Sequence, residues 1–178
     1  NTIAYSNDGV NWITVLGSKN IFTIGVKVAW GGEIGSQMFV AVGSGPNTIA
    51  ISYDGINWTG LGNNLFNTGG TAIFYHTVLK KWFAGGQPDG FAYSTDGINW
   101  TEDTNVSGIN CTSFNLYHNA GGVIDCVFIT TLENNIGKIY VYYHNVLTLI
   151  YTSNTSEIFK YTPFPSSLNQ SEQFVFTS

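Results

Sequence analysis

The segment Ile49-Ala50-Ile51-Ser52-Tyr53-Asp54-Gly55-Ile56-Asn57-Trp58 has two close copies in the same chain. One copy runs from Ile3 to Trp12 and the other from Phe91 to Trp100, and all three align without gaps. Their aspartates, at positions 8, 54 and 96, lie 46 and then 42 residues apart. A sequence period of this length is typical of a unit of four short strands.

Each copy predicts a tight hairpin. Asp-Gly between apolar residues is a strong hairpin signal, because glycine adopts positive φ without a steric penalty. The Asp carboxylate and the Ser hydroxyl can hydrogen-bond to the backbone of their own turn, and the Trp ring packs against a neighbouring sheet. We therefore assign a structural role to twelve residues: Ser6, Asp8, Gly9, Trp12, Ser52, Asp54, Gly55, Trp58, Ser94, Asp96, Gly97 and Trp100.

A second apolar segment precedes the later two copies, Met38–Gly43 in one case and Lys81–Gly86 in the other. Each repeat is therefore expected to contain four strands. The predicted fold is all-β: a single-domain β-propeller of four-stranded antiparallel blades over residues 1–178, incomplete or a fragment of about four blades. The expected blades are residues 1–17 (a half blade), 21–61, 70–103, 110–162 (divergent, with an insertion) and 173–178 (a stub).

At these residues the chain resembles the Asp-box, or bacterial neuraminidase repeat, propellers. It is most similar to bacterial and phage repeats that read Phe-Val-Ala-Val-Gly followed by Ser-x-Asp-Gly-x-x-Trp; the resemblance is good over residues 1–102 and weak beyond. It implies that the three turns lie on the face opposite the usual binding site. The sialidase members clamp a substrate carboxylate with arginines, and this chain contains none, so their catalytic site does not carry over.

Composition argues against several partners. The six basic residues are all lysines, the net charge is −5, and no basic cluster is present. Nucleic-acid binding depends on such clusters, and membrane insertion by a helix needs a long apolar run that the sequence lacks. The three histidines have no metal-ligand spacing, so we expect no metal and no cofactor.

The polar loops opposite the three turns are candidate ligand contacts. Side-chain amides and carboxylates beside aromatic rings can hydrogen-bond sugar hydroxyls, although ordinary solvated loops have the same composition. Asp89 also fits a Pro-Asp-Gly turn with no binding role. The candidates are Asn47, Asn63, Asn64, Gln87, Asp89, Asp103 and Asn105.

The two cysteines, Cys111 and Cys126, are expected on neighbouring strands. A hairpin between them would allow a disulfide, and two buried thiols are the other interpretation.

The sequence thus favours a non-catalytic structural or adhesive module, with other protein subunits or glycans as partners. We expect it in a larger assembly outside the cell, on a cell surface or in a virion or phage tail. A lectin-like carbohydrate-binding role and a fragment of a sialidase-like glycoside hydrolase are the alternatives.

Overall fold

The structure is a computed structural model, and it describes residues 2–87, 90–103, 109–117, 126–133, 136–143, 146–153, 160–161 and 176–177. Nearly all regular structure in these residues is β-strand, which confirms the all-β class; one short 3-10 helix spans Ser18–Asn20. No helix in the described part of the chain is both long and apolar enough to cross a membrane. The chain divides into two compact units, Asn1–Phe114 and Asn115–Ser178.

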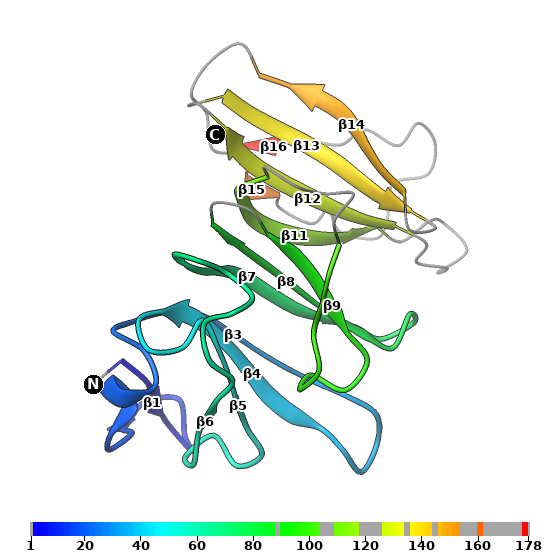
Figure 1. Cartoon of the computed structure of the whole chain (residues 1–178). Coiled ribbons are helices and arrows are strands. Elements are labelled where there is room, and N and C mark those ends of the chain that lie inside the picture. Colours follow the sequence, from blue (N-terminus) through cyan, green and yellow to red (C-terminus); the bar gives the residue numbers. More distant parts are fainter. Residues whose placement is uncertain are drawn as a thin grey trace. The chain divides into compact units, whose positions relative to one another are not determined.

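Unit 1 contains two complete four-stranded antiparallel sheets, each joining four consecutive strands in chain order (Figure 1). The first sheet consists of β3 (Ile24–Gly31), β4 (Met38–Ser44), β5 (Ile49–Ser52) and β6 (Thr59–Gly60). The second consists of β7 (Gly69–His76), β8 (Lys81–Gln87), β9 (Phe91–Ser94) and β10 (Thr101–Glu102).

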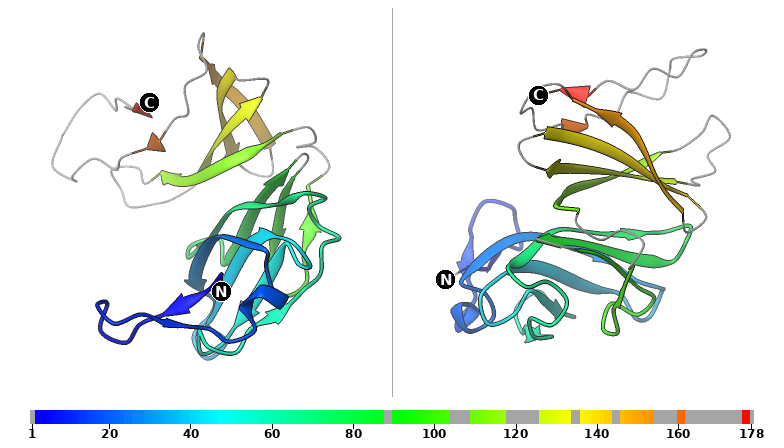
Figure 2. Two further views of the ribbon diagram at one scale, coloured as in Figure 1. Left: turned by 90° about the vertical axis from the view of Figure 1, so that its left-hand side faces the viewer. Right: turned by 45° about the horizontal axis from the view of Figure 1, so that its top comes forward.

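A shorter hairpin of β1 (Ala4–Tyr5) and β2 (Ile13–Thr14) precedes these sheets. Figure 2 shows this hairpin, in dark blue, from two further directions. The sequence copy in this hairpin corresponds to β5–β6 and to β9–β10, because all three copies lie at the same place in their hairpins. The hairpin therefore matches the outer two strands of a complete sheet.

The two complete sheets share one irregularity. The register between β3 and β4 shifts between Gly25 and Lys27, and the register between β7 and β8 shifts between Gly70 and Ala72. A shift at the same position of both sheets shows that the repeat extends from the turns to the details of strand pairing.

The core of unit 1 lies between the two complete sheets. Alternate residues of β4, namely Met38, Val40 and Val42, are buried on the face toward the second sheet, as the two-residue period of a strand requires. They pack against Ile73 and Trp82, which are both fully buried. Packing through apolar residues from both sheets is the main stabilising interaction between successive repeats.

The end of the chain carries a third four-stranded sheet, formed by β11 (Cys111–Tyr117), β12 (Cys126–Glu133), β13 (Ile136–Tyr143) and β14 (Val146–Thr152) in that order. The division between the units falls within β11. In unit 2, Val127, Ile129 and Ile139 are fully buried, and β15 (Lys160–Tyr161) pairs with β16 (Phe176–Thr177).

Candidate functional site

The three repeated turns, Ser6–Trp12, Ser52–Trp58 and Ser94–Trp100, have the same hydrogen bonds; we call them the repeat turns. In the third, the Ser94 Oγ accepts bonds from the backbone N–H of Asp96 (3.2 Å) and Gly97 (2.8 Å), and its hydroxyl donates to Asp96 Oδ1 (2.9 Å). Asp96 Oδ1 also accepts the backbone N–H of Ile98 (2.8 Å) and Asn99 (2.7 Å), while Oδ2 accepts the Asn99 side chain (2.7 Å). Both carboxylate oxygens are thus used within the turn.

The other two repeat turns reproduce this network bond for bond, around Asp8 and Asp54. The glycine that follows each aspartate has φ of 75° or 76°, in the left-handed region that glycine favours. In the second and third turns the Trp ring N–H donates to the carbonyl of that glycine at 3.0 Å.

The same hydrogen bonds hold the pKa of Asp8, Asp54 and Asp96 far below the ordinary value of a carboxyl group. The backbone N–H of the Asn three residues on is the largest cause, and the side chain of the same Asn is the next. Donors that bind the charged form stabilise it relative to the protonated form. These carboxylates therefore stay ionised at neutral pH and cannot act as general acids.

The other end of the two complete sheets carries the loops proposed as ligand contacts. Asn47 is engaged by the protein itself, because its side-chain N–H donates to the Ile21 carbonyl (2.8 Å) and its Oδ1 accepts the Gly62 N–H (2.9 Å). The Asn47 side chain thus joins the segment before β3 to the segment after β6, and its amide is not available to a ligand. Asn63 and Asn64, in the connection from β6 to β7, are exposed.

The remaining candidate loop residues differ from one another. Gln87 is exposed at the end of β8, and its backbone carbonyl accepts bonds from Thr68. Asp103, directly after β10, is buried, and its backbone N–H donates to the Phe91 carbonyl at 2.9 Å, so it lies against β9 and is not exposed on an open loop. Asp89 and Asn105 lie outside the described residues.

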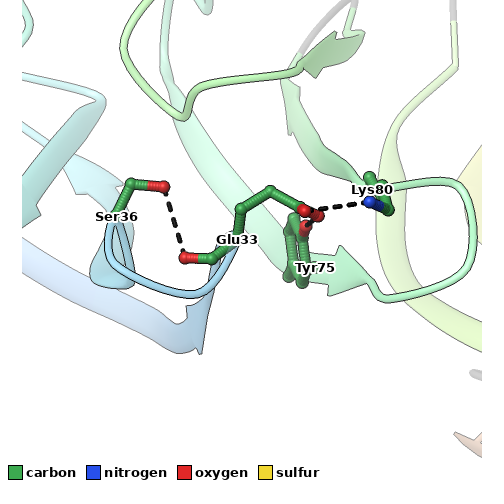
Figure 3. Close-up of polar contacts among 4 residues, drawn as sticks. All are labelled: Glu33, Ser36, Tyr75 and Lys80. Carbon is green, nitrogen blue, oxygen red and sulfur yellow. Dashed lines mark hydrogen bonds and ion pairs between the residues drawn. The ribbon is translucent and has the colours of Figure 1, made fainter.

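A cluster at the repeat-turn end of unit 1 was not anticipated from the sequence. Glu33, in the β3–β4 turn, accepts a hydrogen bond from the Tyr75 hydroxyl (3.2 Å) and forms an ion pair with Lys80 (2.9 Å); Ser36 donates to its backbone carbonyl (3.3 Å) (Figure 3). The pKa of Glu33 is lowered, mainly by the hydrogen bond from Lys80. The pKa of Tyr75 is raised, mainly by its partial burial. The charged carboxylate of Glu33 and the neutral phenol of Tyr75 thus connect the β3–β4 turn of the first sheet with β7 of the second.

Lys80 is the one non-glycine residue with positive φ (52°) in the described part of the chain. Replacing it by glycine or by alanine removes the same ion pair, but only glycine relieves the strain of this backbone conformation. We expect the Lys80→Gly protein to be more stable than the Lys80→Ala protein by about 1 kcal/mol, because the exposed ion pair itself contributes little. Urea unfolding of the two variants measures this difference, and equal stabilities would contradict it.

An open cavity of about 440 Å³ lies between the first hairpin and the first complete sheet. Its walls are mostly apolar and aromatic, and they include Tyr5 and Trp12 from the first hairpin, Val28 and Phe39 from the sheet, and Trp58 from the second repeat turn. Trp12 is 65% exposed and Val28 is 54% exposed, although both are large apolar residues.

Cys111 is a fully buried free thiol, and burial strongly raises its pKa. The side chain of Cys126 lies outside the described side chains. Among the described residues, no three His, Cys, Asp or Glu side chains gather in a way that would hold a metal ion.

Comparison of the chain with protein-family models, with curated proteins and with solved structures gives no match. The class of protein therefore rests on the repeat turns and on the sheets themselves.

Proposed function

We propose that the chain is part of an Asp-box-type β-propeller and serves as a non-catalytic interaction module that contacts proteins or glycans. The observation that carries this proposal is the hydrogen bonding of the repeat turns, in which every carboxylate oxygen is bound within its own turn. Because the carboxylate oxygens of the turn aspartates already accept hydrogen bonds within the turns, we assign these residues a role in supporting the fold. The proposed setting is a larger assembly outside the cell, on a cell surface or in a virion.

Two further observations support the proposal. The two complete four-stranded antiparallel sheets pack face to face through the apolar core that contains Val40 and Trp82, as blades of a propeller do. The given sequence also contains no arginine for the carboxylate clamp that sialidases use. The carboxylate of Glu33 is paired with Lys80 and has a lowered pKa, which is unsuitable for a general acid.

An activity assay tests the non-catalytic role. The protein is incubated with fluorogenic sialosides and with a panel of fluorogenic glycosides, and we expect no turnover above the buffer blank. Saturable turnover that disappears in the Glu33→Gln variant would overturn the proposal, because it would make Glu33 part of a catalytic site.

Glycan binding is a second candidate function, favoured by the exposed side-chain amides of Asn63 and Asn64 beside each other in one loop. Amides of this kind hydrogen-bond sugar hydroxyls. A glycan array probed with the wild-type protein and with the Asn63→Ala/Asn64→Ala double variant examines it. Signals that the double variant loses would support a lectin-like role, and uniform silence would count against it.

A further inference from the structure

The turn between β7 and β8 is closed by a buried histidine. His76, the last residue of β7, has no exposed surface, and its ring centroid lies 6.2 Å from that of Phe74 and 6.3 Å from that of Phe83. Its Nδ1 accepts a hydrogen bond from the backbone N–H of Leu79 at 3.1 Å. A ring nitrogen that accepts a hydrogen bond carries no proton, so His76 is neutral in this conformation, with its proton on Nε2.

The same turn holds Lys80 in position for Glu33. Lys80 follows Leu79 directly, has a φ of 52°, and places its Nζ 2.9 Å from Glu33 Oε2 in the β3–β4 turn (Figure 3). Left-handed backbone is unfavourable for a residue with a Cβ, so the surrounding turn must hold it. The two side chains of the ion pair are 64% and 53% exposed, so the pair contributes little to this by itself. The Leu79–His76 hydrogen bond is the internal bond that closes the turn.

Protonation of His76 is incompatible with the closed turn. An imidazolium ring carries an N–H on both nitrogens, so Nδ1 can no longer accept the Leu79 N–H, and two donors would face each other. The positive charge would also be buried beside Phe74 and Phe83, which is costly. Opening of the turn relieves both problems, because it brings the ring into contact with water.

The ionisable groups on the His76 face of the second sheet do not offset such a charge. Lys81 lies directly opposite His76 in the β7–β8 pairing, so the two side chains share one face. Tyr93 of β9, whose ring centroid is 5.0 Å from Lys81 Nζ, and the buried thiol of Cys111 lie on that face as well. The Asp103 carboxylate is at the other end of the sheet, where its backbone bonds to β9. The group nearest to His76 in the pairing is therefore a second cation.

The opposite face of β7 packs against the first sheet. Tyr75 lies on this face, since successive side chains of a strand alternate, and the Glu33–Lys80 pair lies with it. The charged residue of β3 is Lys27, and β4 has no ionisable side chain. Protonation of His76 thus acts on the Glu33–Lys80 pair through the turn backbone and not by direct contact.

We propose that His76 makes the β7–β8 turn a pH-sensitive switch. At neutral pH the imidazole closes the turn through Leu79 and so keeps Lys80 against Glu33. Below the ordinary pKa of histidine, about 6.5, Nδ1 takes up a proton from solvent, the Leu79 bond is lost, and Lys80 separates from Glu33. The repeat-turn end of unit 1 then presents a separate carboxylate and ammonium group in place of an ion pair. The switch does not depend on which partner the module binds.

The opening of the turn has a defined pH dependence. Only the opened turn binds the additional proton, so the ratio of opened to closed turn is constant above pH 6.5 and increases about tenfold for each pH unit below it. The pKa values of Glu33 and of the turn aspartates lie below the ordinary values of carboxyl groups. The range between about pH 5 and 6.5 therefore reports on histidine and not on these carboxylates.

Amide hydrogen exchange of the full chain, followed by NMR between about pH 5 and 7.5, tests the switch. Each rate is divided by the intrinsic exchange rate at the same pH. The protection factor of the Leu79 amide is expected to fall about tenfold per pH unit below 6.5. The Asn57 amide, which donates to Asp54 in the second repeat turn, is the internal control and should keep its protection factor. A Leu79 protection factor that is the same at pH 5 and pH 7.5 would overturn the proposal.

Two variants separate the acceptor from the proton. His76→Asn has an acceptor oxygen the same number of bonds from the backbone as Nδ1 but does not titrate in this range, so Leu79 should stay protected at every pH. His76→Phe keeps a ring without an acceptor, and Leu79 should be poorly protected at every pH. A pH dependence that persists in His76→Asn would overturn the proposal, because another group would then be responsible. Circular dichroism checks that both variants fold, and the wild-type result decides if either does not.

The carboxyl-carbon NMR signal of Glu33 reports whether Lys80 is released. In the wild-type protein this signal is expected to shift with the same midpoint as the imidazole carbons of His76, and in His76→Asn it should show no step in that range. A Glu33 signal that does not change while His76 becomes protonated would overturn the coupling between the histidine and the ion pair.

Discussion

Replacing Trp82 by alanine is expected to lower the free energy of unfolding of unit 1 by about 3–5 kcal/mol. The Trp82 side chain has no exposed surface and lies in the core between the two complete sheets. Its ring centroid is 5.0 Å from that of Tyr75, and it sits directly under the third repeat turn, where a Cβ at Gly97 would lie 3.1 Å from its Nε1. Removing the ring leaves a cavity that neighbouring strands cannot close. Urea unfolding followed by far-ultraviolet circular dichroism measures the loss.

Trp12 provides the matched control, because it is the same residue type at 65% exposure in the first repeat turn. Trp12→Ala is expected to cost no more than about 0.5 kcal/mol, as for other exposed positions. If both variants lost the same amount, burial between successive sheets would not be what stabilises the repeats.

Replacing Asp96 by alanine should destabilise the third repeat turn by about 1–2 kcal/mol, a value discounted for the exposure of the carboxylate. Alanine removes the acceptor for two backbone N–H groups and for the Asn99 amide, and it leaves the Ser94 hydroxyl without its partner. Chemical unfolding of Asp96→Ala and of Asp96→Asn gives the comparison. Asn keeps one acceptor oxygen, so we expect an intermediate loss.

A wild-type stability in the Asp96→Ala variant would show that the turn network does not support the fold. A loss in Asp96→Asn equal to that in Asp96→Ala would show that the negative charge, and not the acceptor geometry, is responsible.

Much of the fold could be predicted from the sequence, because the deciding interactions are local. Asp-Gly with a Ser two residues before the Asp specifies a hairpin within a few residues, and the structure has the expected turn at Ser6, Ser52 and Ser94. The two complete sheets span Ile24–Gly60 and Gly69–Glu102. The assignment of residues 21–61 and 70–103 to propeller blades, like the propeller arrangement itself, stays a prediction.

The features that the sequence did not predict depend on residues far apart in the chain. Glu33 and Lys80 are 47 positions apart, and nothing in either segment indicates that the two turns meet. Asn47 was expected on an open loop, but its amide binds backbone groups of distant connections. Val28 of β3 is 54% exposed whereas Ile73 of β7 is fully buried, and the similar apolar patterns of the two strands do not indicate this difference. Local patterns carry no information about such contacts.

The aspartates of the repeat turns make the stability of the fold depend on pH. Because the folded-state pKa of each turn aspartate is lowered, its contribution to stability is complete above the unfolded-state value, about 3.9. The contribution decreases as the pH falls below that value and is lost once the pH passes the lowered folded-state pKa.

An NMR titration of the side-chain carboxyl carbons of Asp8, Asp54 and Asp96 in the folded protein tests most directly whether these carboxylates serve the turns alone. We predict that all three carboxylates remain ionised well below the ordinary aspartate pKa of about 3.9, because their oxygens are bound inside the turns. A pKa at or above that ordinary value for any of the three would contradict it, since that carboxylate would then be free for binding or chemistry.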